Sequence, residues 1–156
     1  MPAAPADLAD RMTLILDDHR GMEGALLPIL HAVQATWGYV PAAAQPIIAQ
    51  DLNISRAEVH GVISFYHDFR EEPAGAHVMR LCRAEACQAM GADRVALHAQ
   101  QVLGVGWHET SANGITLEPV FCLGLCACAP AAQIDGRVIG RVDEARLDAL
   151  LTEVTA

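Results

Sequence analysis

Residues 77–87 have the sequence HVMRLCRAEAC, in which a short apolar run ends directly at a cysteine and a second cysteine follows after four residues. Residues 115–126, ITLEPVFCLGLC, have a similar arrangement, in which Cys122 follows the strand-like run and Cys126 comes after three further residues. Alternating apolar and polar side chains over a few residues are typical of β-strands. We therefore expect strands at 77–81 and 115–120, each followed at once by a loop that carries two cysteines.

The segments around these two strands complete an α/β pattern. Apolar spacing predicts a helix over about 86–103, with Val95, Leu97 and Leu103 facing inward. Residues 132–139 predict a hairpin that turns at Asp135 and Gly136. Asp143 is expected to open a last helix. Three leucines should form the inward face of that helix: Leu147, Leu150 and Leu151.

The region before the first strand is predicted to be helical, because apolar residues recur there every three or four positions. Leu8, Met12, Ile15 and Leu16 share one face of a first helix. The second should end at Gly38, the third should begin at Pro41, and Ser55 with Glu58 forms a capping box for the fourth. An apolar cluster at the end of the fourth helix is expected in the core: Ile63, Phe65, Tyr66 and Phe69.

The polar, turn-forming segment 70–76 predicts a boundary between two parts of the chain. We expect residues 1–69 to form a helical region that docks a partner, since this region contains no cysteine and a four-helix bundle of this size has a small core. Residues 70–156 should form the α/β domain, which contains all five cysteines.

Composition excludes several functions for this chain of 156 residues. Nineteen acidic residues against ten basic ones give a net charge of −9, which opposes binding to nucleic acid. All ten basic residues are arginine, so Schiff-base chemistry and a P-loop are excluded. No apolar run is long enough to cross a membrane. We find no signal peptide and expect a reducing cytoplasm, where cysteines are metal ligands more often than disulfides.

The cysteine spacing favours a [2Fe–2S] centre. Cys82 and Cys87 enclose four residues, which is wide for a turn around one zinc ion and matches the spacing found at two-iron centres. Structural zinc, a redox dithiol and buried unligated cysteines remain as alternatives. A Rieske centre is disfavoured because neither loop contains a histidine. Gly124 allows a positive φ in the middle of the second loop.

The fifth cysteine, Cys128, follows Cys126 after one residue. It could replace Cys126 as a ligand. We expect it instead to be a small buried side chain against the loop, because free cysteine is among the most frequently buried residues.

Residues 81–91, LCRAEACQAMG, and 122–130, CLGLCACAP, resemble the thioredoxin-like [2Fe–2S] ferredoxin family, and the likeness extends to the helical segments 27–34, 37–41 and 59–66. The family includes the 24 kDa-type subunit of respiratory complex I, the matching subunit of NAD-reducing hydrogenases and the gamma subunit of NAD-dependent molybdenum formate dehydrogenases. The resemblance implies a thioredoxin-like [2Fe–2S] domain preceded by an N-terminal helical bundle. It also implies four cluster ligands: Cys82, Cys87, Cys122 and Cys126.

Within the family, the first loop is most similar to that of the formate dehydrogenase gamma subunit. Complex I subunits usually have Gly-Thr in this loop, whereas this chain has Ala84 and Glu85. The resemblance implies an electron-transfer subunit with one cluster and no turnover site of its own. FMN, NAD and the molybdenum cofactor are then expected on partner subunits, namely a flavin- and NAD-binding subunit and a larger dehydrogenase subunit.

Two other classes of function are alternatives to this interpretation. A zinc-stapled adaptor would use the same cysteines without redox chemistry. A thioredoxin-like dithiol enzyme would need a Cys-x2-Cys pair, which the chain lacks. If the cluster is present, four thiolates and the oxidised core together carry about −2, and one electron makes this −3. Loop N–H groups and Arg83 are candidates to stabilise that added charge.

Overall fold

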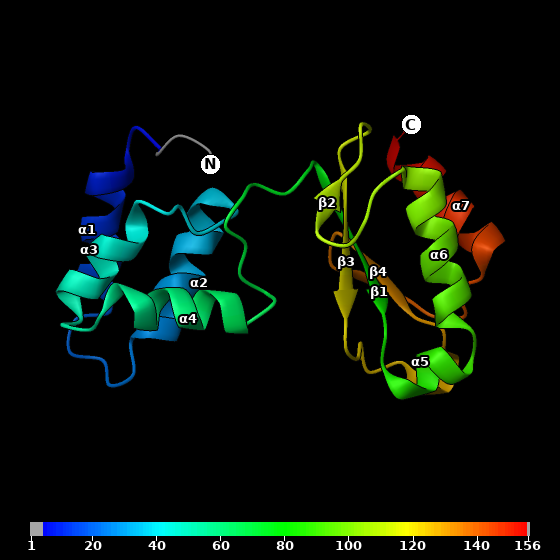
Figure 1. Ribbon diagram of the computed structural model, residues 1–156, viewed down its shortest axis with the longest axis horizontal. Coiled ribbons are helices and arrows are strands. Elements are labelled where there is room, and N and C mark those ends of the chain that lie inside the picture. The colour runs from blue at the N-terminus through cyan, green and yellow to red at the C-terminus, as the bar shows by residue number, and fades with distance from the viewer. Residues whose placement is uncertain (1–4, 156) are drawn as a thin grey trace. The chain divides into compact units, whose positions relative to one another are not determined.

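The computed structural model describes residues 5–155 and divides the chain into two compact units, one up to Pro73 and one from Ala74 (Figure 1). The division falls inside the expected turn at 70–76, four residues beyond the expected end of the helical region at 69. The expected units 1–69 and 70–156 also include residues 1–4 and 156, which lie outside the described residues.

The first unit consists of four helices around one hydrophobic core: α1 (Leu8–Asp18), α2 (Leu26–Trp37), α3 (Ala44–Asp51) and α4 (Arg56–Phe65). The face predicted for the first helix is confirmed, and α2 likewise buries one side. Their buried members are Leu8, Met12, Leu16, Ile29, Leu30 and Val33. Ile15 is partly buried and packs against the same core.

Local signals set the ends of these helices. Ser55 Oγ accepts a hydrogen bond from the Glu58 N–H at 3.1 Å, and the Glu58 carboxylate accepts one from the Ser55 N–H at 2.8 Å, so the capping box is confirmed. Gly38 ends α2 with a φ of 80°, as expected. The predicted start of α3 at Pro41 is wrong, because Pro41 forms a preceding turn in which its carbonyl accepts from the Ala44 N–H.

The predicted aromatic core at the end of α4 is only half right. Ile63 and Phe69 are buried, but Phe65 is 75% exposed and Tyr66 is 44% exposed. Ile63 follows Val59 at helical spacing on the inward face, whereas Phe65 lies about 200° around the helix from Ile63. Helical spacing within the group therefore did not place all four side chains on one face.

The second unit has a five-stranded sheet in the order β2-β3-β1-β4-β5. The strands are β1 (His77–Cys82), β2 (Glu109–Thr110), β3 (Ile115–Val120), β4 (Ala132–Ile134) and β5 (Arg137–Ile139). Strands β1 and β3 are parallel, and every other pair is antiparallel. The strands expected at 77–81, at 115–120 and in the hairpin are confirmed, while the two-residue β2 was not predicted.

Helices α6 (Ala92–Leu103) and α7 (Glu144–Thr155) lie on one face of this sheet (Figure 1). Their apolar sides share a core with alternate residues of the strands. The fully buried members are Met79, Ala99, Ile115, Leu117, Ala132 and Leu147. Asp143 accepts a hydrogen bond from the Arg146 N–H at 2.8 Å and so caps α7, as its sequence predicted.

The single helix predicted over 86–103 is wrong. Gly91, with a φ of 92°, separates a short α5 (Glu85–Ala89) from α6. Val95 is buried, as expected, and Leu103 is partly buried. Leu97 is 59% exposed because the inward face of α6 follows Val95, Ala96 and Ala99 instead. No helix within residues 5–155 is long and apolar enough to span a membrane.

The hairpin between β4 and β5 is tied to the start of β1. Asp135 has a φ of 48° and Gly136 one of 86°, which a two-residue hairpin turn requires. The Asp135 carboxylate accepts hydrogen bonds from His77 Nδ1 at 2.7 Å and from the Val78 N–H at 2.9 Å. Burial acts to raise the pKa of Asp135, but these two hydrogen bonds outweigh it and hold the pKa below its ordinary value.

We predict that Asp135→Asn lowers the free energy of unfolding at pH 7 by about 0.5–1 kcal/mol, a small value because the carboxylate is partly exposed. Asparagine tolerates the same backbone conformation, so the change isolates the charge. A carboxyl with a lowered pKa stabilises the fold above its unfolded value near 4, and this is lost as the pH falls through the folded pKa. In urea unfolding the difference between the two proteins should therefore be largest at pH 7 and should shrink as the pH is lowered below about 4 through the folded pKa; a difference that does not change with pH would contradict the prediction.

Candidate metal centre

The parallel pairing of β1 and β3 brings the two cysteine loops to the same edge of the sheet. Cys82, the last residue of β1, is in register with Val120, the last residue of β3. The Arg83 N–H donates to the Val120 carbonyl at 2.7 Å, and the Cys82 N–H donates to the Ala131 carbonyl at 3.0 Å. The first loop is therefore anchored on both sides, to β3 and to the segment that enters β4.

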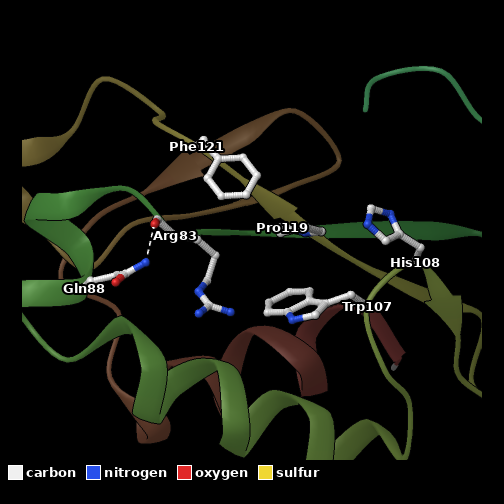
Figure 2. Close-up of a pocket in the computed structure, with 6 residues that line it drawn as sticks. All are labelled: Arg83, Gln88, Trp107, His108, Pro119 and Phe121. Carbon is white, nitrogen blue, oxygen red and sulfur yellow. Dashed lines mark hydrogen bonds between the residues drawn. The ribbon is translucent and has the colours of Figure 1, made fainter. Parts of the chain in front are cut away.

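The first loop places its two cysteines in an apolar environment. Cys82 is 3% exposed and Cys87, in α5, is 2% exposed. Gln88 Nε2 donates to the Arg83 carbonyl at 2.7 Å and closes the turn between strand and helix (Figure 2). Small and apolar side chains surround the pair: Ala84, Ala92, Val120, Leu123, Leu125, Ala129 and Ala131.

The second loop is compact and its cysteines are exposed. The Sγ atoms of Cys122 and Cys126 lie 3.9 Å apart. The Gly124 N–H donates to Cys122 Sγ at 3.3 Å, and Gly124 has the positive φ, 76°, that its sequence predicted. Cys122 itself has a φ of 133°, a conformation that is strained for a residue with a Cβ and that concentrates at functional sites. No feature of the sequence indicated this strain.

Neighbouring sulfurs shift the pKa values of the thiols. Burial raises the pKa of Cys87, and the hydrogen bond with Cys82 adds to this. The hydrogen bond with Cys122 and its charge raise the pKa of Cys126. Cys126 also lies close enough to Cys82 and Cys87 for charge on one sulfur to affect another. Cys87 and Cys126, one thiol from each pair, therefore resist deprotonation unless positive charge is supplied nearby.

This donor set fits a two-iron centre. A [2Fe–2S] cluster takes two thiolates on each iron, and its cationic core supplies the charge that stabilises them. A structural zinc ion needs four ligands around one point. Within residues 5–155, no three histidine, cysteine or acidic side chains form a group that could hold a single ion, whereas the two pairs are present. The seven histidines of the chain belong to no such group.

Cys128 lies in the 3-10 turn η1 (Cys126–Cys128) that ends the second loop. Its side chain is partly buried, which is less than the buried position that we expected. Its N–H donates to the Leu125 carbonyl at 2.8 Å, and its carbonyl accepts from the Arg141 N–H at 2.6 Å. Gly140 lies against it so closely that an added Cβ would be 2.7 Å from Cys128 Cβ and 2.8 Å from its carbonyl oxygen. The turn is therefore held by its backbone and by contact with Gly140.

A hollow of about 400 Å³ lies beside the first loop and has three aromatic side chains in its lining (Figure 2). Its lining residues are Arg83, Gln88, Trp107, His108, Pro119 and Phe121. The Arg83 guanidinium lies 5.4 Å from the centre of the Trp107 ring. Sequence reasoning did not connect Trp107 with the cysteines, because 24 residues separate it from Arg83 and only the sheet brings them together.

Comparison with known proteins shows which family and which relatives this chain resembles. Residues 12–155 match the family described as thioredoxin-like [2Fe-2S] ferredoxin. An NADH-quinone oxidoreductase subunit from Pseudomonas aeruginosa is 40% identical over 119 residues, covering 76% of this chain and 72% of the relative. The HndA subunit of the NADP-reducing hydrogenase from Solidesulfovibrio fructosivorans is 31% identical over 132 residues, covering 84% and 77%.

A solved structure has the same fold. The NAD+-reducing [NiFe]-hydrogenase in the air-oxidised state superimposes with a TM-score of 0.66 and 24% identity over 83% of this chain. The matched region is 22% of that hydrogenase chain. At this level of identity the likeness concerns the fold.

We predict that Gly140→Ala destabilises the chain by about 1–3 kcal/mol, because the new methyl group would displace the backbone of Cys128. Gly61, inside α4, is the matched control, since a Cβ there meets no atom within 4 Å. Gly61→Ala should stabilise by about 0.5–1 kcal/mol. Denaturant unfolding measures both, and equal effects of the two substitutions would show that the contact with Cys128 does not constrain the turn.

Proposed function

Because this chain belongs to the thioredoxin-like [2Fe–2S] ferredoxin family, we propose that Cys82, Cys87, Cys122 and Cys126 hold its one [2Fe–2S] cluster. The observation that carries the proposal is the pairing of β1 with β3, which places two thiol pairs at one edge of the sheet. The separation into pairs supports a two-iron centre over a zinc-stapled adaptor.

When bound, the cluster accepts and releases single electrons. The chain's own residues determine the environment of that exchange. The buried pair, Cys82 and Cys87, keeps water away from one side, and the exposed pair, Cys122 and Cys126, leaves the other side accessible to a redox partner. The Gly124 N–H already donates to a sulfur, which is the type of contact that stabilises added negative charge on a cluster.

The chain is an electron-transfer subunit of an NAD-linked oxidoreductase complex, the role that its relatives in NADH-quinone oxidoreductases and hydrogenases indicate. We propose more specifically the gamma subunit of a cytoplasmic, NAD-dependent molybdenum formate dehydrogenase. The residues Arg83, Ala84 and Glu85 in the first loop support this. FMN and NAD would bind to one partner subunit, and the molybdenum cofactor to a larger dehydrogenase subunit.

The names of the relatives favour a second candidate, the equivalent subunit of respiratory complex I or of an NAD-reducing hydrogenase. The partner subunits and substrates distinguish the two candidates. In both, the electron would pass between this chain and a flavin-carrying subunit, so the cysteine chemistry is the same and cannot separate them.

We propose that the helical unit docks a partner subunit. One side of each helix packs into the core of this unit. Phe65 and Tyr66 at the end of α4 are exposed, and their rings form an edge-to-face pair with centroids 5.1 Å apart. Exposed aromatic side chains are enriched at the centres of protein interfaces. The cysteines, in contrast, all lie in the second unit.

We predict that the purified protein contains about two irons and two acid-labile sulfides per chain. Serine at position 82, 87, 122 or 126 should abolish or distort the cluster, because oxygen binds iron–sulfide cores less well than thiolate does. Cys128→Ser should retain it. Iron analysis and visible spectra of an anaerobic preparation measure this. An intact spectrum in Cys126→Ser but not in Cys128→Ser would reverse the assignment of these two ligands.

We predict that an affinity-tagged chain, purified from its source cells, brings with it a molybdenum-containing complex that reduces NAD+ with formate. Molybdenum and flavin analysis and a formate-dependent rate at 340 nm are the measurements. Co-purification with a quinone-reducing or hydrogen-oxidising complex would support the second candidate instead.

The same purification tests the docking proposal. Phe65→Ser should lose most of the partner subunits while the chain keeps its cluster. Leu14→Ser is the matched control, because Leu14 is an exposed apolar side chain on α1 of the same unit. Equal partner recovery with both variants would contradict a role for Phe65 in docking.

A further inference from the structure

Arg83 is the one basic residue in the two cysteine-bearing segments 82–91 and 119–131. It follows Cys82 directly, and its N–H donates to the Val120 carbonyl at 2.7 Å. Its backbone is therefore attached to the ends of both strands that carry the cysteines.

The side chain of Arg83 is held in one place by two contacts from distant parts of the chain. Its Nη2 donates to the Asp93 carboxylate at 2.9 Å, at the start of α6. Its guanidinium lies 5.4 Å from the centre of the Trp107 ring, toward which it extends in Figure 2. An ion pair and a cation–π contact together remove the freedom that an arginine on a surface loop normally has.

One N–H of the Arg83 guanidinium group is buried without a hydrogen-bond partner. The side chain is 27% exposed, and within residues 5–155 its Nε is the buried side-chain nitrogen or oxygen that has no hydrogen-bond partner. Burying a cationic donor unpaired is costly, so such an atom calls for a reason. Negative charge close to the first cysteine loop would be such a reason, because it would stabilise the buried cationic N–H.

A cluster held by the four cysteines would supply that charge. Four thiolates and the oxidised core sum to about −2, and one electron, taken from a reduced flavin or from dithionite, converts one ferric ion to ferrous and makes the sum −3 with no bond formed or broken. The chain as a whole already carries −9, which opposes this step. A fixed positive charge on the residue that follows Cys82 is then worth more to the reduced state than to the oxidised one.

We propose that Arg83 sets the reduction potential of the cluster by stabilising its reduced form, with Trp107 positioning its guanidinium and Asp93, its ion-pair partner, offsetting part of its charge. This inference rests on the proposed binding of a [2Fe–2S] cluster by the four cysteines. It adds a residue outside the ligand set that determines how easily the centre accepts an electron.

The test is a reductive titration of the full-length protein, followed by visible and electron paramagnetic resonance spectra. Arg83→Gln should make the equilibrium constant for reduction about two- to tenfold less favourable, the size of effect expected when one partly solvated charge near the centre is removed. The difference should shrink at high salt, because the guanidinium is partly exposed. Arg83→Lys, which keeps the charge, should recover most of the loss.

Asp93→Asn is the second variant, and it separates charge from structure. Removing this carboxylate leaves the positive charge of Arg83 less compensated, so reduction should become more favourable than in the unaltered protein. A purely structural role would instead make Asp93→Asn shift the equilibrium in the same direction as Arg83→Gln, since both break the same 2.9 Å contact.

Arg137→Gln is the matched control. Arg137 pairs with Glu153 at 2.9 Å and lies in β5, in register with Ile134 of β4, which is in register with Met79 of β1. Three residues of strand, about 10 Å, and two strand spacings, about 10 Å across the sheet, put Arg137 about 14 Å from Cys82, beyond the distance at which exposed charges act at physiological salt. The reduction potential of the cluster in Arg137→Gln should equal that in the unaltered protein.

Two failures have different meanings. If the unaltered protein assembles no iron, the proposed function is wrong and this inference falls with it. If the cluster assembles and Arg83→Gln leaves the equilibrium constant unchanged, or if Arg83→Lys lowers it as much as Arg83→Gln does, only the role of Arg83 is overturned.

Discussion

The parallel hydrogen bonding between β1 and β3 is the constraint on which the site depends. Parallel strands end at the same edge of a sheet, so the residues that follow Cys82 and Val120 enter solvent side by side. Loops that are about 40 residues apart in the sequence thereby become neighbours, and Leu123 and Leu125 of the second loop pack against the cysteines of the first. The crossover through α5 and α6 makes this possible, and the core beneath α6 and α7 holds both strands in register.

The two loops contribute unequally to the site that we propose. The first is rigid and dry, because its cysteines are buried among small apolar residues and its turn is closed by Gln88. The second is exposed, and it contains both Gly124 and the strained Cys122. A centre built this way is shielded on one side and open on the other, which suits the exchange of single electrons with another protein surface. Arg83 would place a fixed charge at the shielded side.

The helical unit and the α/β unit each have their own hydrophobic core. Each unit's sequence therefore has its own pattern of apolar residues, helical in the first and mixed in the second. Helix caps and apolar periodicity are local properties, so the capping box at Ser55 and the turn at Gly38 could be predicted from a few residues. Local periodicity did not predict which side of α4 Phe65 would occupy. That depends on where Val59 and Ile63 find their packing partners in the other helices.

By itself, the sequence determined the cysteine spacing, the two main strands, the hairpin turn at Asp135 and the division of the chain near residue 70, because each of these is encoded within a short segment. Tertiary structure alone decided the rest. The break at Gly91 and the exposure of Leu97 follow from how α6 must pack on the sheet. The contact of Arg83 with Trp107 exists only because the sheet brings residues 24 positions apart together. Spacing along a chain can indicate which side chains act together, but strand pairing decides which of them meet.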